Sequence, residues 1–101
     1  MRRVRWSQEA RSAQRDWLDG LEAQDTRLTD RALSESEALS LRTGAHPFSY
    51  RPSRWKGLRE ASLLRWHKIV VFQVLQDEVV IVSFYDARQD LARIFPLPES
   101  H

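Results

Sequence analysis

The stretch "GLREASLLRWHKIVVFQVLQDEVVIVSFYD", residues 57–86, decides the fold, because apolar and β-branched residues crowd into it. Such residues, bounded by turn-forming residues, are typical of β-strands. The polar pair Gln76-Asp77 interrupts the apolar run and predicts a tight turn. We therefore predict a short strand near residues 58–62, a longer strand over 66–75 and a third strand over 78–85.

Both faces of the two long strands are apolar. In the strand over 66–75, alternation divides the side chains between opposite faces: Val70, Phe72 and Val74 on one, and Ile69, Val71 and Leu75 on the other. Strands joined by a tight turn run antiparallel, and such a sheet often leaves one face to water. Here both faces need a cover. The sequence offers a clear internal cover for only one, so we expect a partner element on the other.

The residues before this stretch predict one short strand and a helix. Residues 3–6, "RVRW", alternate polar and apolar side chains, as a half-buried strand does. Ser7 suits a helix N-cap, and the helix after it has an apolar face made of Ala10, Ala13, Trp17 and Leu21. Gly20 either ends this helix or only weakens it.

A second helix follows after a short connection. Asp25 or Thr26 suits its N-cap, and its apolar stripe consists of Leu28, Ala32, Leu33, Leu39 and Leu41. We predict that Thr43-Gly44 ends this helix, because His46-Pro47 prevents its continuation. The two helices form a helical hairpin, which is the cover for one face of the sheet.

Taken together, these elements predict a single α+β domain over residues 1–101. It consists of a short N-terminal strand, a helical hairpin over about 8–42, a loop over 43–57 and a twisted sheet of three antiparallel strands over about 58–86. An extended tail over 95–101 follows, because Pro96 and Pro98 prevent a helix there.

Composition excludes several classes of protein. The chain has no cysteine, and its three histidines, His46, His67 and His101, have no helical i, i+4 spacing, so we expect no metal and no cofactor. No phosphate loop or Gly-x-Ser-x-Gly elbow is present. The basic N-terminus lacks an apolar signal core, and no apolar run approaches the roughly 20 residues of a membrane span. We therefore expect a cytoplasmic protein without membrane contact.

Charge is distributed unevenly along the chain, although the net charge is only +2. Residues 42–68 carry seven Lys or Arg side chains against Glu60 alone, whereas the flanking segments are mildly acidic. This distribution indicates an anionic partner, either nucleic acid or an acidic peptide. The alternative is a solvated, Arg-rich loop without a partner.

Many of these cations lie beside aromatic residues. An antiparallel pairing about the turn at 76–77 places residues 66–68 next to residues 85–88. The resulting cluster suits phosphate binding with base stacking, or binding of a protein target. Equally, Arg65 and Arg88 can pair with Glu60, Asp86 and Asp90, and Trp55 can simply pin its loop. The predicted binding residues are Arg54, Trp55, Lys56, Arg59, Arg65, His67, Lys68, Tyr85 and Arg88.

The order of several short motifs resembles the RelE/ParE superfamily of type II toxin–antitoxin toxins, in particular its ParE-like, plasmid stabilization branch. The motifs are "VRWSQEA" at 4–10, a helical hairpin, a loop with Gly44 and Pro47, "GLRE" at 57–60 and "VVIVSFYDARQD" at 79–90. The resemblance covers roughly residues 3–94. It implies a compact β-α-α-β-β-β fold with an antiparallel sheet, and a cognate antitoxin as the missing cover.

The resemblance also implies two different activities. RelE-like members are metal-independent, ribosome-dependent mRNA endonucleases. Of their residues, only Arg59 and Arg88 have matching positions here, and the candidate nuclease set is Arg59, Arg65, Lys68, Tyr85 and Arg88, with Tyr85 and Lys68 as substitutes. The strand position that usually holds Arg is Ile69 in this chain, and the aromatic after it is Phe72 rather than Tyr. ParE-like members are linked to inhibition of DNA gyrase and growth and lack that catalytic set.

Three functions follow as hypotheses. The first is a non-enzymatic toxin that inhibits a target such as gyrase and is neutralised by an antitoxin. The second is an endoribonuclease that acts on mRNA at the ribosome. The third is a non-toxic binding module on the same fold. The departures at Ile69 and Phe72 favour the first over the second.

Overall fold

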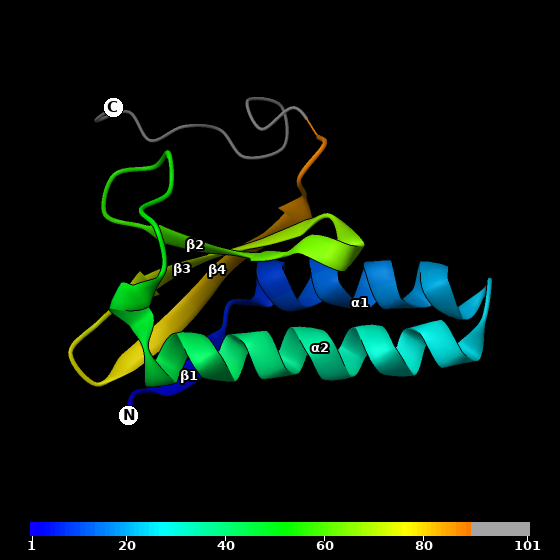
Figure 1. The fold of residues 1–101 in the computed structure, drawn as a ribbon, viewed down its shortest axis with the longest axis horizontal. Helices are drawn as coiled ribbons and strands as arrows, with labels where there is room; N and C mark the ends of the chain where they lie inside the picture. The colour runs from blue at the N-terminus through cyan, green and yellow to red at the C-terminus, as the bar shows by residue number, and fades with distance from the viewer. Residues whose placement is uncertain (90–101) are drawn as a thin grey trace.

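The computed structural model describes residues 1–89, in which two helices lie against one face of a four-stranded sheet (Figure 1). This is the predicted α+β fold, whereas the tail predicted over 95–101 lies outside the described residues. The elements, in chain order, are β1 (Arg3–Trp6), α1 (Gln8–Glu22), α2 (Thr26–Ala45), a 3-10 helix η1 (Pro47–Ser49), β2 (Arg59–Leu63), a second 3-10 helix η2 (Leu64–Trp66), β3 (Lys68–Val74) and β4 (Glu78–Asp86).

The sheet has the strand order β1-β4-β3-β2. The strands β2, β3 and β4 are antiparallel neighbours, as predicted. In contrast, β1 pairs with β4 in parallel, from Arg3 opposite Glu78 to Trp6 opposite Ile81. The sheet is therefore mixed, not antiparallel throughout. The helical hairpin returns the chain to the end of the sheet at which β1 begins, since Gly44 near the end of α2 contacts Arg2. Three antiparallel strands that follow from there leave the last of them, β4, parallel to β1.

A β-bulge interrupts the pairing of β3 with β4. Val71 pairs with Ser83 and Phe72 with Ile81, so Val82 has no partner in the ladder. Because of this extra residue, Ile81 and Phe84 both face the helices although they are three positions apart. Simple alternation along β4 does not predict this arrangement.

Ser7 joins the start of α1 to the bulge. Its side-chain oxygen accepts a hydrogen bond from the Ala10 amide at 3.1 Å, which caps the helix as predicted. The same hydroxyl donates to the Val82 carbonyl at 3.3 Å, and the Ser7 amide donates to the Ile81 carbonyl at 2.8 Å. One side chain thus fixes where α1 begins and where it meets β4.

The main core lies between the helices and the sheet. Its buried members are Ala10, Leu39, Ala61, Leu63, Val70, Phe72, Val79, Ile81 and Phe84. Trp17 of α1 packs on Phe84 with ring centroids 5.3 Å apart. The helical hairpin is therefore the cover of one sheet face, as predicted, although Leu33 and Leu41 of the stripe predicted for the second helix are exposed.

The opposite face has an internal cover as well. Trp55, from the loop before β2, is 1% exposed and forms a second cluster with Val71 and Tyr85. Its ring meets the Tyr85 ring edge to face at 6.3 Å. The prediction that this face lacks an intramolecular cover was wrong, because Trp55 folds back from the loop before β2 onto Val71 of β3 and Tyr85 of β4. The alternative in which Trp55 pins its loop is confirmed.

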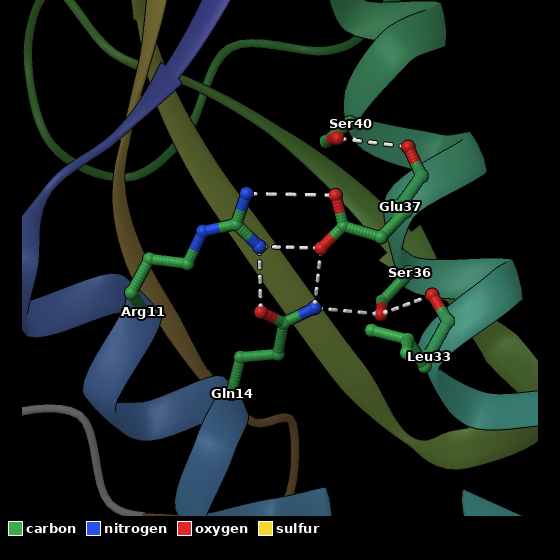
Figure 2. A network of polar contacts seen from close by, with 6 residues as sticks. All are labelled: Arg11, Gln14, Leu33, Ser36, Glu37 and Ser40. Atoms are coloured by element: carbon green, nitrogen blue, oxygen red, sulfur yellow. Dashed lines mark hydrogen bonds and ion pairs between the residues drawn. The ribbon is translucent and has the colours of Figure 1, made fainter. Parts of the chain in front are cut away.

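A network of polar side chains connects the two helices (Figure 2). Gln14 is 3% exposed and its amide donates to Ser36 and to Glu37, each at 2.9 Å. Arg11 forms an ion pair with Glu37 and also donates to Gln14. Burial raises the pKa of Glu37, but the hydrogen bonds from Arg11 and Gln14 outweigh it, so the net pKa is lowered.

Neither glycine predicted near a helix end terminates its helix. The helix α1 continues through Gly20 to Glu22, and α2 continues through Gly44 to Ala45. Gly44 instead allows β1 to approach α2, since the Arg2 amide donates to the Gly44 carbonyl at 3.1 Å. In the described part of the chain, neither helix is long and apolar enough to cross a membrane.

Candidate partner-binding surface

The sheet separates the predicted binding residues into two groups. Arg59 begins β2 and pairs with Phe72, near the end of β3. Lys68 begins β3 and pairs with Asp86 at the end of β4. This register confirms that residues 66–68 lie beside residues 85–88, as predicted, and it places Arg59 at the other end of the β2–β3 ladder.

The first group lies at the Lys68 end of the β3–β4 ladder, where Arg88 and Lys68 both approach the carboxylate of Asp86. The Arg88 guanidinium donates to both carboxylate oxygens, at 3.0 and 2.8 Å, and the Arg88 amide donates to the same group at 2.8 Å. Lys68 Nζ lies 4.0 Å from this carboxylate. The hydrogen bonds from Arg88 hold the pKa of Asp86 well below its usual range, and Asp86 in turn raises the pKa of Arg88.

Lys68 lies on the helix side of the sheet. Its ammonium is 5.6 Å from the ring centre of Trp17 and 5.8 Å from that of Phe84. Burial lowers the pKa of Lys68, and attraction to Asp86 only partly offsets this effect. The amine is enclosed by aromatic rings, and only 15% of the side chain is exposed.

Arg65 and Trp66 connect this end of the sheet to α2. Arg65 forms an ion pair with Glu35 at 3.3 Å, and the Trp66 indole donates to the same carboxylate at 2.9 Å. The prediction that Trp66 begins the strand over 66–75 was wrong: Trp66 belongs to η2, and His67, with a left-handed backbone at φ of 56°, separates it from β3. The His67 side chain is exposed, and its carbonyl accepts from the Ala87 amide at 2.7 Å.

Tyr85 lies on the face opposite Lys68. It packs against Trp55 and is 6% exposed. Burial raises the pKa of its phenol, and Glu60 adds to the shift. The five residues proposed for an endoribonuclease are therefore dispersed within residues 1–89, over two faces and two ends of the sheet.

The second group centres on an exposed aromatic ring. Phe48 of η1 is 62% exposed, and the guanidinium carbons of Arg59 and Arg2 lie over its ring at 5.1 and 5.3 Å from the centroid. Arg59 donates to the Tyr50 carbonyl at 2.6 Å, and Arg2 donates to the Leu75 carbonyl at 2.9 Å. We call these three residues the Arg2–Phe48–Arg59 surface.

A hollow of about 310 Å³ adjoins this surface. It is lined by Phe48, Pro52, Gly57, Leu58, Arg59 and Val74. Arg54 and Lys56, in the same loop, are exposed, and the Arg54 guanidinium lies 5.5 Å from the Trp55 ring centre.

Sequence reasoning missed Arg2 and Phe48 as members of this site. The two residues come from the N-terminus and from η1, which meet the end of β3 at one end of the molecule (Figure 1). The available sequence signal was a Phe directly after Pro47 in a predicted loop. No local pattern links this Phe to the N-terminal arginines.

No family model and no curated protein matches the sequence. Among solved structures, a chain of the chromosomal ParDE TA system from P. aeruginosa superposes with a TM-score of 0.69 at 19% identity, over 87% of this chain and 98% of that one. The conserved hypothetical protein HP0894 from Helicobacter pylori gives a TM-score of 0.47 at 18% identity, over 83% and 92%. The first similarity shows that the chain has the RelE/ParE-like fold that its motifs indicated.

Proposed function

We propose that this chain is the toxin of a type II toxin–antitoxin pair and that an acidic protein partner holds it inactive. The observation that carries the proposal is the fold match to nearly the whole of a ParDE chain. The motifs between residues 3 and 94 support it independently, because they occur in the order of the same superfamily. The concentration of Lys and Arg over 42–68 suits a partner of opposite charge.

The arrangement of side chains favours a target-inhibiting toxin, such as one acting on DNA gyrase, over an endoribonuclease. A general base and the cations that stabilise a phosphate must meet within hydrogen-bond reach of one substrate. Here the Tyr85 and Lys68 side chains lie on opposite faces of the sheet, and Arg88 is held by Asp86. The dispersed positions support the non-enzymatic hypothesis.

The test is induction of the chain alone in a bacterial host, with growth, mRNA integrity and plasmid supercoiling followed in one culture. We expect growth arrest with intact mRNA and altered supercoiling. Arrest with cleaved mRNA would show the endoribonuclease instead. Normal growth at a confirmed protein level would leave the non-toxic binding module.

A matched control separates toxicity from the load of expression. Gly44→Ala is expected to weaken the fold as a whole, because a Cβ atom there would meet the Arg2 carbonyl oxygen and the Val4 side chain. If the toxin acts as a folded protein, this variant should arrest growth less than the wild type does at equal expression. Equal arrest would indicate a nonspecific effect of the overproduced chain.

A further inference from the structure

The cations around the sheet differ in their partners, and Arg2 and Arg59 both lie over one aromatic ring and bind carbonyl oxygens. Within residues 1–89, five cations on or near the sheet already hold a carboxylate: Arg5 with Glu78, Arg51 with Glu60, Arg65 with Glu35, and Lys68 and Arg88 with Asp86. Arg59 and Arg2 make their hydrogen bonds to backbone carbonyls instead. Their positive charges are therefore not neutralised within the described part of the chain.

Both guanidinium groups are also held in place. Each is fixed by one carbonyl and lies over the same Phe48 ring, at 5.1 and 5.3 Å from its centre. A guanidinium has five N–H donors, so one or two bonds to a carbonyl leave others for an anion. Because the groups are already ordered, binding an anion here costs little side-chain entropy.

The neighbouring hollow has an apolar part that can take an apolar side chain, beside the polar contribution of Arg59. Pro52, Leu58 and Val74 line it together with the Phe48 ring, and its volume of about 310 Å³ suits one or two side chains. Phe48 itself is 62% exposed and forms part of the lining of this hollow. A ligand that fits both features has a negative charge next to an apolar side chain.

A peptide fits this requirement better than a nucleic acid. Base stacking needs an open ring face, whereas guanidinium groups already lie over the Phe48 ring. An acidic peptide can place a carboxylate on the guanidinium groups and a Leu or Phe side chain in the hollow. Hot spots of protein interfaces combine Arg and aromatic residues in this manner.

We infer that the Arg2–Phe48–Arg59 surface is a binding site for an acidic peptide segment, with a carboxylate on Arg2 and Arg59 and an apolar side chain in the adjoining hollow. The inference rests on the proposed function only in taking the antitoxin as the natural source of that segment. The chemistry of the site is independent of toxicity.

The test uses a fluorescein-labelled synthetic dodecapeptide of glutamates and leucines, and the full chain. Fluorescence anisotropy should show binding that weakens as salt rises, because the contact includes exposed charges. Arg59→Gln and Phe48→Ala should each reduce affinity about tenfold, and Arg59→Lys less, because it keeps the charge. Arg65→Gln is the matched control, since Arg65 already pairs with Glu35, and it should leave affinity unchanged.

Several results would overturn the inference. Absence of peptide binding to the wild-type chain would do so, as would equal losses from Arg59→Gln and Arg65→Gln. Equally tight binding of a peptide with glutamine in place of glutamate would show that the site does not recognise a carboxylate. A single-stranded RNA that binds more tightly than the peptide and depends on Arg59 would make the surface a nucleic-acid site. Thermal unfolding of each variant checks that the fold is retained.

The two proposals can fail separately. Peptide binding is measured on the isolated chain and requires no growth effect. If peptide binding depends on Arg59 but induction leaves growth unchanged, the peptide-binding proposal is supported and the toxin proposal is refuted. If growth stops but the peptide does not bind, the toxin function stands and this surface is not its partner site.

Discussion

Gly44 shows how a single residue sets the distance between two elements. A Cβ atom added there would lie 2.5 Å from the Arg2 carbonyl oxygen and 2.7 Å from Val4 Cγ2. The oxygen belongs to the backbone directly before β1, so the backbone at the start of the strand would have to move. Gly20, also within a helix, has nothing within 4 Å of such an atom.

These two glycines therefore predict opposite effects. Gly44→Ala should lower the free energy of unfolding by about 1–3 kcal/mol, the usual cost of overpacking. Gly20→Ala should raise it by about 0.5–1 kcal/mol, because alanine favours a helix interior. Urea unfolding of the two variants measures both. A stabilising Gly44→Ala would show that β1 does not approach α2 as described.

Asp86 predicts how stability depends on pH. Its pKa is lowered in the folded state, chiefly by Arg88, relative to an ordinary value of 3.8. A lowered folded pKa stabilises the protein above the ordinary value, and this stabilisation is lost as pH falls below it. The cost of Asp86→Asn to the free energy of unfolding should therefore be larger at pH 7 than at pH 3.

Urea unfolding at the two pH values tests this expectation. Arg88→Gln is the companion variant, because it removes the main cause of the lowered pKa. An equal cost of Asp86→Asn at both pH values would mean that Asp86 acts through its shape and not its charge.

At the scale of elements, Ser7 caps α1 and holds the bulge of β4 at once. Ser7→Ala removes both contacts and should cost about 1–2 kcal/mol of stability. Ser7→Asp keeps the cap acceptor but loses the donor to Val82, so its cost should be smaller. Ser7→Thr keeps both and should cost least. Thermal unfolding that ranks Asp level with Ala would show that the bulge contact dominates.

Trp55 predicts what the second cluster contributes. Trp55→Ala should cost about 3–5 kcal/mol, as is usual for a buried aromatic residue. It should also bring the pKa of Tyr85 down towards its ordinary value of 10.0, because burial is the main cause of the shift. Ultraviolet titration in a Tyr50→Phe background isolates the Tyr85 phenol, since the chain has two tyrosines. An unchanged pKa of Tyr85 in this variant would show that Trp55 does not contribute to the burial of the Tyr85 phenol.

At the scale of the whole molecule, the ion pairs predict which cation matters most to a partner. If the chain has the antitoxin proposed above, charge reversal at Arg59 should weaken that complex about tenfold or more. Arg88→Glu should weaken it less, because Asp86 already neutralises Arg88. Isothermal titration of the purified pair measures both variants. Unchanged affinity for the double variant Arg59→Glu/Arg88→Glu would remove basic-surface recognition altogether.

The parts of the fold that rest on neighbouring residues were predictable. The β3–β4 hairpin followed from two apolar runs and the turn at 76–77, and the register beside Asp86 followed from the same turn. The start of α1 followed from Ser7 and the apolar spacing after it. For the site, the basic stretch indicated Arg59. Charge alone did not predict that Arg65 and Arg88 form ion pairs whereas Arg59 binds a backbone carbonyl.

The sequence by itself determined the α+β class, the helical hairpin and the antiparallel order of β2, β3 and β4, because strand alternation, helix periodicity and turn chemistry act over a few residues. Only the tertiary structure decided the parallel placement of β1, the bulge at Val82, the cover by Trp55 and the meeting of Arg2 with Phe48 and Arg59. These depend on contacts between residues far apart in the chain, and no local pattern encodes which distant partner a side chain will meet.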